Sequence, residues 1–245
     1  MMPADNATRR ARLRTRARAG SPALKFVRDL VVIVVIAILI SALIKTFVVR
    51  SFYIPSSSME NTLLVNDRII VNELVPNLIP IEHGDVVVFT DPGNWLPPQQ
   101  PVPLNLLSAL GAALTAVGLS TGDSNNHLIK RVIGLPGETV VCCTSTGQLT
   151  INDVPISEPY IQVPDAQSQA TKSPFTVTVP DGKLWVMGDN RYNSADSAFH
   201  YLNGSPGGGF VPISSVVGRA VVVSWPAKHW GWLSNYPETF TPTGR

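Results

Sequence analysis

The hydrophobic pattern divides the chain into one long apolar run and a series of short alternating segments. Residues 30–49 are apolar or small except for Ser41, Lys45 and Thr46. Twenty residues of helix span about 30 Å, the thickness of a bilayer core. Lys45 lies near one end of the run, where its long stem lets the ammonium reach the membrane surface. We therefore predict a transmembrane helix over residues 30–49.

Two other structures produce a similar run, a buried helix of a soluble protein and the core of a cleaved secretory signal. A buried helix rarely follows so basic a tail: residues 1–29 carry eight basic and two acidic side chains, against a net charge of +2 for the whole chain. The run is also longer than a usual signal core, and no small-x-small cleavage site follows it before Arg50. We therefore favour a permanent anchor. It places the basic tail in the cytoplasm, against an anionic membrane rather than nucleic acid, and residues 50–245 outside the cytoplasmic membrane.

Beyond residue 50 the pattern changes to short β-branched runs separated by Gly, Pro, Asn and Asp. The predicted strands are Arg68–Val71, Val86–Phe89, Leu128–Ile133, Thr139–Cys142, Gln148–Ile151, Thr176–Val179, Leu184–Val186 and Val216–Ser224. Many short strands with tight turns predict a mainly β domain with two antiparallel sheet regions behind the single helix.

Two segments depart from this pattern. Residues 92–126 form an insertion-like segment in which Leu104–Leu119 is rich in Ala and Leu, and we expect a short helix there that packs on the body rather than on lipid. The C-terminal segment is rich in aromatic side chains, namely Trp225, Trp230, Trp232, Tyr236 and Phe240. Such a cluster suits either a bilayer interface or a small aromatic core.

Cysteine and histidine give no metal site. Cys142 and Cys143 are adjacent, and two ligands alone do not hold zinc. They form either a vicinal disulfide in an oxidising compartment or two free thiols in a strand. The four histidines show no metal-ligand spacing. No metal or other cofactor is expected, because the candidate chemistry, a serine with a lysine, needs none.

A serine and a lysine are the strongest candidates for chemistry. Ser58 belongs to a serine cluster eight residues past Arg50, at most about 29 Å along the chain from the predicted membrane exit. Lys130 lies on a predicted strand whose alternation places it on one face with Leu128 and Val132. A lysine desolvated there would have a lowered pKa and serve as a general base, whereas most lysines lie on a solvent face.

A third segment, residues 186–197, is dense in turn-forming residues. Its default interpretation is a structural loop. Its charged side chains Asp189, Arg191 and Asp196 would equally suit a network that holds a site in shape.

Taken in order behind an N-terminal anchor, the three blocks resemble the bacterial type I signal peptidases, the serine–lysine leader peptidases. The resemblance covers most of residues 25–225. Its motifs are Ile54-Pro55-Ser56-Ser57-Ser58-Met59 with Thr62-Leu63, Lys130-Arg131 with Gly134 and Pro136-Gly137, and Gly188-Asp189-Asn190-Arg191 with Asn193-Ser194 and Asp196-Ser197.

The resemblance implies a signal-peptidase-like fold and a role for each matching residue. Ser58 would be the nucleophile and Lys130 its general base, with Ser194 orienting the lysine and Ser56 helping the Ser58 N–H to stabilise the oxyanion. Side chains implied to line shallow apolar subsites for an Ala-x-Ala signal peptide are Phe52, Ile54, Pro55, Met59 and Ile129. Asp189, Arg191 and Asp196 would be structural charges near the site.

The chain departs from the family pattern at three positions. Ser57 stands where glycine is frequent, Asn61 where proline is frequent, and Ala198 where some members carry an arginine that pairs with the residue matching Asp196. Two rival functions remain, a self-cleaving serine–lysine repressor and a catalytically dead membrane-tethered binding module. The apolar run and the lack of a DNA-binding module oppose the first, and the retained Ser58, Lys130 and Ser194 oppose the second.

Overall fold

The computed structural model describes residues 22–97, 126–164 and 169–241. The chain divides into two compact units, residues 1–43 and 44–245. The predicted helix at Leu104–Leu119 and most of the basic tail lie outside the described residues.

The first unit contains most of one long helix, α1, which runs from Pro22 to Phe47 and ends within the first residues of the second unit. Its side chains are described for residues 25–40, and the large apolar ones from Phe26 to Ile40 are exposed. Across the part of the chain that the structure describes, no helix combines the length and the apolarity needed to cross a membrane.

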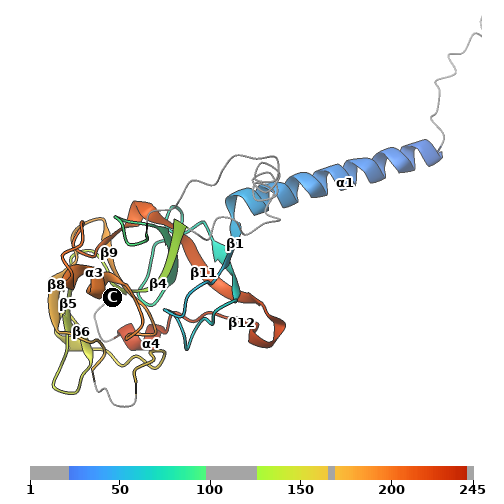
Figure 1. Ribbon diagram of the computed structural model, residues 1–245. Coiled ribbons are helices and arrows are strands. Elements are labelled where there is room, and N and C mark those ends of the chain that lie inside the picture. Colours follow the sequence, from blue (N-terminus) through green and yellow to red (C-terminus); the bar gives the residue numbers. More distant parts are fainter. Residues whose placement is uncertain (1–21, 98–125, 165–168, 242–245) are drawn as a thin grey trace, which may run out of the picture. The chain divides into compact units, whose positions relative to one another are not determined.

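The second unit is built mainly from two antiparallel sheets (Figure 1). The larger sheet has the strand order β1-β2-β11-β3-β4-β9-β10, and β12 pairs with β11. Its strands are β1 (Val49–Tyr53), β2 (Arg68–Asn72), β3 (Val86–Thr90), β4 (His127–Gly134), β9 (Lys183–Met187), β10 (Val211–Pro212), β11 (Val216–Trp225) and β12 (Gly231–Trp232). Because β1, β4 and β9 each lead into or carry one sequence block, this sheet assembles the candidate site.

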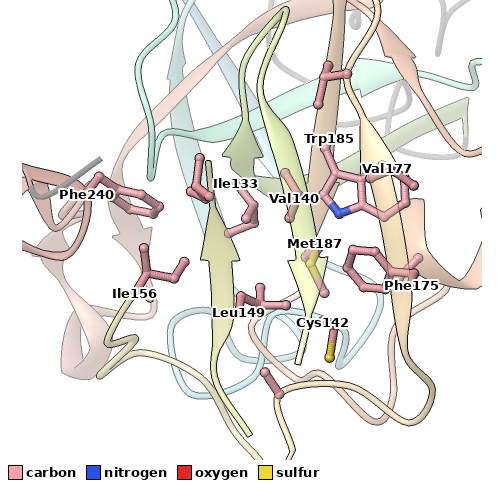
Figure 2. Close-up of a cluster of buried hydrophobic side chains, with 14 of the residues drawn as sticks. Ile133, Val140, Cys142, Leu149, Ile156, Phe175, Val177, Trp185, Met187 and Phe240 are labelled. Atoms are coloured by element: carbon pink, nitrogen blue, oxygen red, sulfur yellow. The ribbon is translucent and has the colours of Figure 1, made fainter. Parts of the chain in front are cut away.

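The smaller sheet has the order β7-β6-β5-β8. Its strands are β5 (Thr139–Cys142), β6 (Leu149–Ile151), β7 (Val154–Pro155) and β8 (Phe175–Thr178). Figure 2 shows Phe175 and Val177 of β8 beside Trp185 of β9, and the Phe175 and Trp185 ring centroids lie 5.0 Å apart. The smaller sheet therefore shares a buried apolar core with one end of the larger sheet. Cys142, which ends β5, forms a disulfide with Cys143.

Short helical segments connect the strands. They are α3 (Ser197–Leu202), η2 (Ile213–Ser215), η3 (Ala227–His229) and α4 (Pro237–Phe240). Of these, α3 follows the third sequence block directly, and its N-cap is Asp196.

The predicted two-sheet antiparallel β domain is confirmed, and every predicted strand overlaps an observed one. The aromatic C-terminal segment is partly buried and partly exposed. Phe240 is buried in the core and Tyr236 packs against it, whereas Trp225, Trp230 and Trp232 are 59%, 61% and 74% exposed.

Candidate active site

Ser58 and Lys130 meet although 72 residues separate them. Ser58 lies in the turn that follows β1, and Lys130 lies in the middle of β4. The Lys130 Nζ donates to Ser58 Oγ at 2.7 Å and to the carbonyl of Ile129 at 2.8 Å. Both side chains are buried, with 7% of Ser58 and 4% of Lys130 exposed. The 2.7 Å between the Lys130 Nζ and the Ser58 Oγ is a distance at which a proton can pass between a hydroxyl and an amine.

The environment of Lys130 favours the neutral form of its amine. Val132, on the same face of β4, is buried in an apolar cluster with Val87, the cross-strand partner of Lys130, and Leu128 packs against that cluster. Burial lowers the pKa of Lys130 from 10.5 to about 8, and the nearby charges of Asp196 and Asp189 only partly oppose this shift. Desolvation thus leaves the lysine partly neutral close to physiological pH.

Two further serines lie at the pair. The Ser56 Oγ is 3.4 Å from the Ser58 Oγ. The Ser194 Oγ is buried and has no hydrogen-bond partner among the described residues. The hydrogen bonds of the Lys130 Nζ go to Ser58 and Ile129, so the expected contact with Ser194 is not among them.

Gly188 explains how closely Ser194 approaches the nucleophile turn. A Cβ added at Gly188 would lie 2.3 Å from the Ser194 Oγ and 2.4 Å from the Ser58 carbonyl oxygen. The Ser194 hydroxyl and the Ser58 carbonyl therefore both lie against the Cα of Gly188, and only glycine fits at that position. The turn is held from the same side by the Asn190 N–H, which donates to the Ser58 carbonyl at 3.1 Å.

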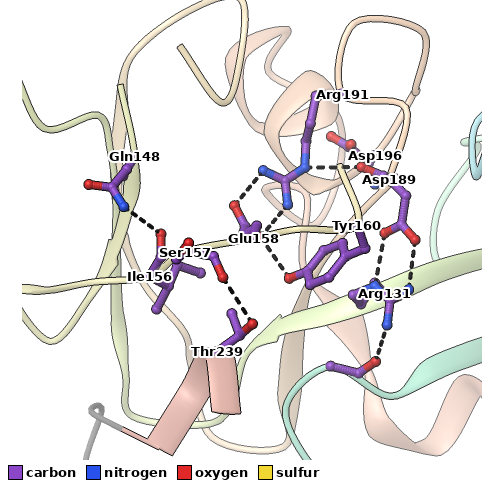
Figure 3. A network of polar contacts seen from close by, with 12 residues as sticks. Arg131, Gln148, Ile156, Ser157, Glu158, Tyr160, Asp189, Arg191, Asp196 and Thr239 are labelled. Atoms are coloured by element: carbon purple, nitrogen blue, oxygen red, sulfur yellow. Dashed lines mark hydrogen bonds and ion pairs between the residues drawn. The ribbon is translucent and has the colours of Figure 1, made fainter. Parts of the chain in front are cut away.

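Asp189 anchors the strand that carries the lysine (Figure 3). Its carboxylate accepts two hydrogen bonds from Arg131, at 2.9 Å from Nε and 2.7 Å from Nη2, and both side chains are completely buried. Arg131 also donates to the carbonyl oxygens of Gly84 and Ser234. The hydroxyl of Thr62, in the nucleophile turn, donates to the same carboxylate. Asp189 therefore joins the nucleophile turn to β4.

Arg191 and Asp196 hold the rest of the third block in place. Arg191 forms a buried ion pair with Glu158 and donates to the Gly188 carbonyl at 3.0 Å. Asp196 accepts from the backbone N–H of Gly188 at 3.0 Å and from the first turn of α3. Asp189, Arg191 and Asp196 each have a different partner rather than pairing with one another, and Asp196 needs no arginine at position 198.

The two departures in the serine block fit the observed backbone. Asn61 has a φ of 87°, a conformation that proline cannot adopt, and its side-chain amide donates to the Tyr160 carbonyl at 3.0 Å. The Ser57 hydroxyl accepts from the Asn193 amide at 2.8 Å. Both residues therefore attach this turn to the neighbouring loops.

A small apolar pocket lies between β1 and β4. Its lining residues are Phe52, Tyr53, Ile54, Pro55, Ile69, Val88, His127, Leu128 and Ile129. Four of the five predicted subsite residues are among them. The fifth, Met59, is completely buried and packs in the core cluster that also contains Phe52 and Ile54. It begins a tight turn in which its carbonyl accepts from the N–H groups of Thr62 and Leu63.

Sequence reasoning missed two contributors for which the alternation of β4 held the signal. His127 shares a strand face with Ile129, so its place in the pocket wall, 5.2 Å from the Phe52 ring, follows from period two. Arg131 shares that apolar face with Ile133, and a buried arginine requires a carboxylate. Glu158 had no such signal. Within the described ranges, no group of three His, Cys, Asp or Glu side chains could hold a metal ion.

One family model and several known proteins are similar to this chain. Residues 27–225 match the family model described as signal peptidase, peptidase S26. A probable signal peptidase I from Mycobacterium leprae (strain TN) is 39% identical, over 84% of this chain and 79% of its own. Signal peptidase I from Mycobacterium tuberculosis (strain ATCC 25618 / H37Rv) is 37% identical, over 84% and 74%. The crystal structure of a signal peptidase I from Enterococcus faecalis V583 matches with a TM-score of 0.36 and 27% identity, over 57% of this chain and 95% of that one.

Proposed function

This chain belongs to the signal peptidase family, peptidase S26, and we propose that its Ser58 and Lys130 form the catalytic dyad that cleaves signal peptides from exported preproteins. Membership makes the protein a serine endopeptidase, a hydrolase. The observation that carries the dyad is the 2.7 Å contact between the Lys130 Nζ and the Ser58 Oγ, two side chains that are both buried.

The proposed reaction begins with Lys130 as a neutral amine. Its lone pair accepts the hydroxyl proton while the Ser58 Oγ attacks the scissile carbonyl. The Ser58 N–H and the Ser56 hydroxyl stabilise the oxyanion, and loss of one such donor typically costs about 10²–10³ in rate. Lys130 returns the proton to the leaving amine, and water then hydrolyses the acyl-enzyme with the same lysine as base. The family resemblance assigns the orientation of the lysine to the Ser194 hydroxyl, which is buried beside Gly188 but makes no hydrogen bond to Lys130 in this structure.

The pocket between β1 and β4 is the proposed site for the residues that precede the cleaved bond. Phe52, Ile54, Pro55 and Ile129 give it apolar walls, which suits the small side chains of an Ala-x-Ala sequence. Met59 supports this wall from the core instead of contacting substrate. The extended residues on both sides of the pocket also offer backbone groups to an extended peptide.

We further propose a single-pass topology at the cytoplasmic membrane. Residues 1–29 would be a basic cytoplasmic tail, residues 30–49 the anchor, and residues 50–245 the extracytoplasmic catalytic domain, with 92–126 as an insertion-like segment. The apolar sequence of the run and the exposed apolar side chains of α1 support this proposal. Lipid is then a partner, and a signal peptide held in the same bilayer reaches the site at a raised effective concentration.

Cleavage of an exported preprotein by the full chain tests the dyad. Ser58→Ala and Lys130→Met should each lower turnover by about 10³-fold or more, because each removes a group that bonds to or exchanges protons with the reacting atoms. Two matched controls are Ser145→Ala, at an exposed serine in the turn between β5 and β6, and Lys172→Met, at an exposed lysine. Both controls should cleave at rates close to wild type. Near-normal turnover by either dyad variant would show the assignment to be wrong.

A further inference from the structure

A second cavity, with a volume of about 430 Å³, has no lining residue in common with the pocket between β1 and β4. Its walls are residues 85–86 at the start of β3, residues 219–221 in the middle of β11, and residues 232–235, which begin in β12. Sites for small molecules in proteins have volumes of roughly 300–1,000 Å³. The second cavity is therefore large enough to hold a ligand of its own.

The Arg219 guanidinium gives this cavity an open pair of hydrogen-bond donors. Its Nη1 donates to the Asp85 carboxylate at 3.2 Å, and it makes no other hydrogen bond to the described residues. Its Nε and Nη2 are thus left open, on a side chain that is 27% exposed. Arg131 uses the same two nitrogens to hold both oxygens of the Asp189 carboxylate (Figure 3). A carboxylate is therefore the group that fits the open edge of Arg219.

Asp85 does not compete for that edge. Its side chain is completely buried, with one oxygen on the Arg219 Nη1 and the other accepting from the Glu82 N–H at 3.0 Å. The Asp85 carboxylate is thus held on a different nitrogen of Arg219 from the two that are open. A guanidinium can bind one carboxylate on each of two edges, because its five N–H groups point in fixed directions.

The remaining wall suits an apolar body attached to the carboxylate. Val86 and Ala220 contribute aliphatic side chains that belong to a buried core cluster, and Leu233 packs against the same cluster. Trp232 adds an indole ring that is 74% exposed. An apolar lining with a few polar groups that fix orientation is typical of a small-molecule site.

The cavity is joined to the anchor of β4 through two backbone carbonyls. Arg131 donates to the Gly84 carbonyl at 2.7 Å and to the Ser234 carbonyl at 2.9 Å. Gly84 directly precedes Asp85, and Ser234 itself lines the cavity. A ligand that contacts both walls would therefore also hold the two carbonyls that Arg131 binds.

We infer that this second cavity binds a carboxylate carried on an apolar body, with the carboxylate on Arg219 and the body against Trp232 and Leu233. The inference goes beyond the proposed function, because no cavity residue belongs to the proposed dyad or substrate pocket. Two sources share this chemistry, a free small carboxylate and an acidic side chain of a bound preprotein.

Ligand-observed NMR tests the site with the full chain in detergent micelles. The parent protein carries Ser58→Ala, the probe is 3-phenylpropionate, and its neutral amide, 3-phenylpropionamide, is the matched control ligand. We expect a Kd of about 1 mM for the acid, an affinity typical of a ligand of about eleven non-hydrogen atoms. The amide should bind at least about fivefold more weakly, because it brings no charge to the guanidinium.

One conservative variant keeps the fold while it removes the paired donors. Arg219→Lys retains a positive charge beside the buried Asp85, but it lacks the planar fork, so the acid should bind at least about fivefold more weakly than to the parent. Arg68→Lys, at an exposed arginine of β2 that does not line the cavity, should leave the acid's affinity unchanged.

Three results would overturn the inference. They are no saturable binding of the acid up to about 10 mM, equal affinity for acid and amide, and equal affinity of the acid for the parent and for Arg219→Lys. None of them bears on the proposed function, since the parent lacks the Ser58 hydroxyl and the readout needs no proteolysis.

Cleavage then identifies the source of the carboxylate. The protein with Ser58 intact is given a preprotein whose acidic side chains after the cleavage site are changed to amides. A KM that rises with wild type but not with Arg219→Lys would support binding of the site to the preprotein. An unchanged KM, together with binding of 3-phenylpropionate, would support a free small carboxylate.

Discussion

The pH dependence of cleavage tests the central physical claim, that Lys130 works as a neutral amine. Burial lowers its pKa from 10.5 to about 8. At pH 7 an amine with the lowered pKa is neutral in about one molecule in ten, against about three in ten thousand for an ordinary lysine. Desolvation alone thus raises the active fraction at pH 7 by a factor of roughly 300.

Initial rates of preprotein cleavage from about pH 6 to about pH 10 measure this titration. We expect kcat/KM to rise about tenfold per pH unit at first and to level off near pH 8, where half of Lys130 is neutral. Ser58→Ala at each pH gives the background. A profile that is flat from neutral to strongly alkaline pH, or one that rises only near 10.5, would refute a lysine base with a lowered pKa.

The same titration should appear in stability. Between about pH 8 and 10.5 the unfolded chain binds a proton at Lys130 that the folded chain does not bind. The free energy of unfolding should therefore rise with pH across this window, by about 3 kcal/mol in total from this group. Chemical unfolding of wild type and Lys130→Met over this window isolates the contribution, because the variant lacks the group. Parallel pH profiles for the two proteins would contradict it.

Three further predictions concern the third sequence block. Gly188→Ala should lower turnover at least about 10²-fold and destabilise by about 1–3 kcal/mol, because its Cβ would overlap the Ser194 hydroxyl and the Ser58 carbonyl; a wild-type rate and melting curve would contradict this. Asp189→Ala should cost about 3–5 kcal/mol in urea unfolding, because it leaves Arg131 buried without its carboxylate; a loss below about 1 kcal/mol would show that the pair is unimportant. Ser194→Ala should leave the free energy of unfolding within about 0.5 kcal/mol of the wild-type value, because the Ser194 hydroxyl makes no hydrogen bond within the described residues. The same variant should lower kcat more than it changes KM, and an unchanged kcat would remove Ser194 from the mechanism.

The strands were predictable wherever β-branched side chains alternate over several residues. The strand β1, Val49–Tyr53, was missed because its first residue continues the apolar run and its next two are polar. Pairing with β2 over all five residues determines its structure, and such a partner cannot be read from local sequence. The strands β7, β10 and β12 have two residues each, too few to show any period.

The candidate site was less accessible to pattern alone. Alternation placed Lys130 on one face with Leu128 and Val132, but an exposed lysine was the more common outcome for such a strand. Lys130 contacts Ser58, which lies 72 positions earlier in the sequence. The prediction that these two residues act together came from the family resemblance and not from periodicity. For the third block the sequence left two interpretations open, a structural loop or a charged network that holds a site in shape, and it named no partners for the charges. Their observed partners include Arg131 and Glu158, which lie on segments distant in sequence, so that only the assembled fold defines them.

Neighbouring cations on β4 have opposite electrostatic states, and this contrast explains the site. Lys130 and Arg131 are both almost fully buried, 4% and 0% exposed, on opposite faces of the strand. Burial lowers the pKa of each, but Arg131 donates two hydrogen bonds to the Asp189 carboxylate, whose charge raises the pKa of Arg131 above its ordinary value. The hydrogen bonds of Lys130 go to a hydroxyl and a carbonyl instead, and its pKa falls. Burial is therefore not what distinguishes a base from a structural cation here. The carboxylate of Asp189 distinguishes them, because it pairs with Arg131 and not with Lys130. It keeps Arg131 charged as an anchor for β4, and it accepts a hydrogen bond from Thr62 of the nucleophile turn, which lies against the amine of Lys130.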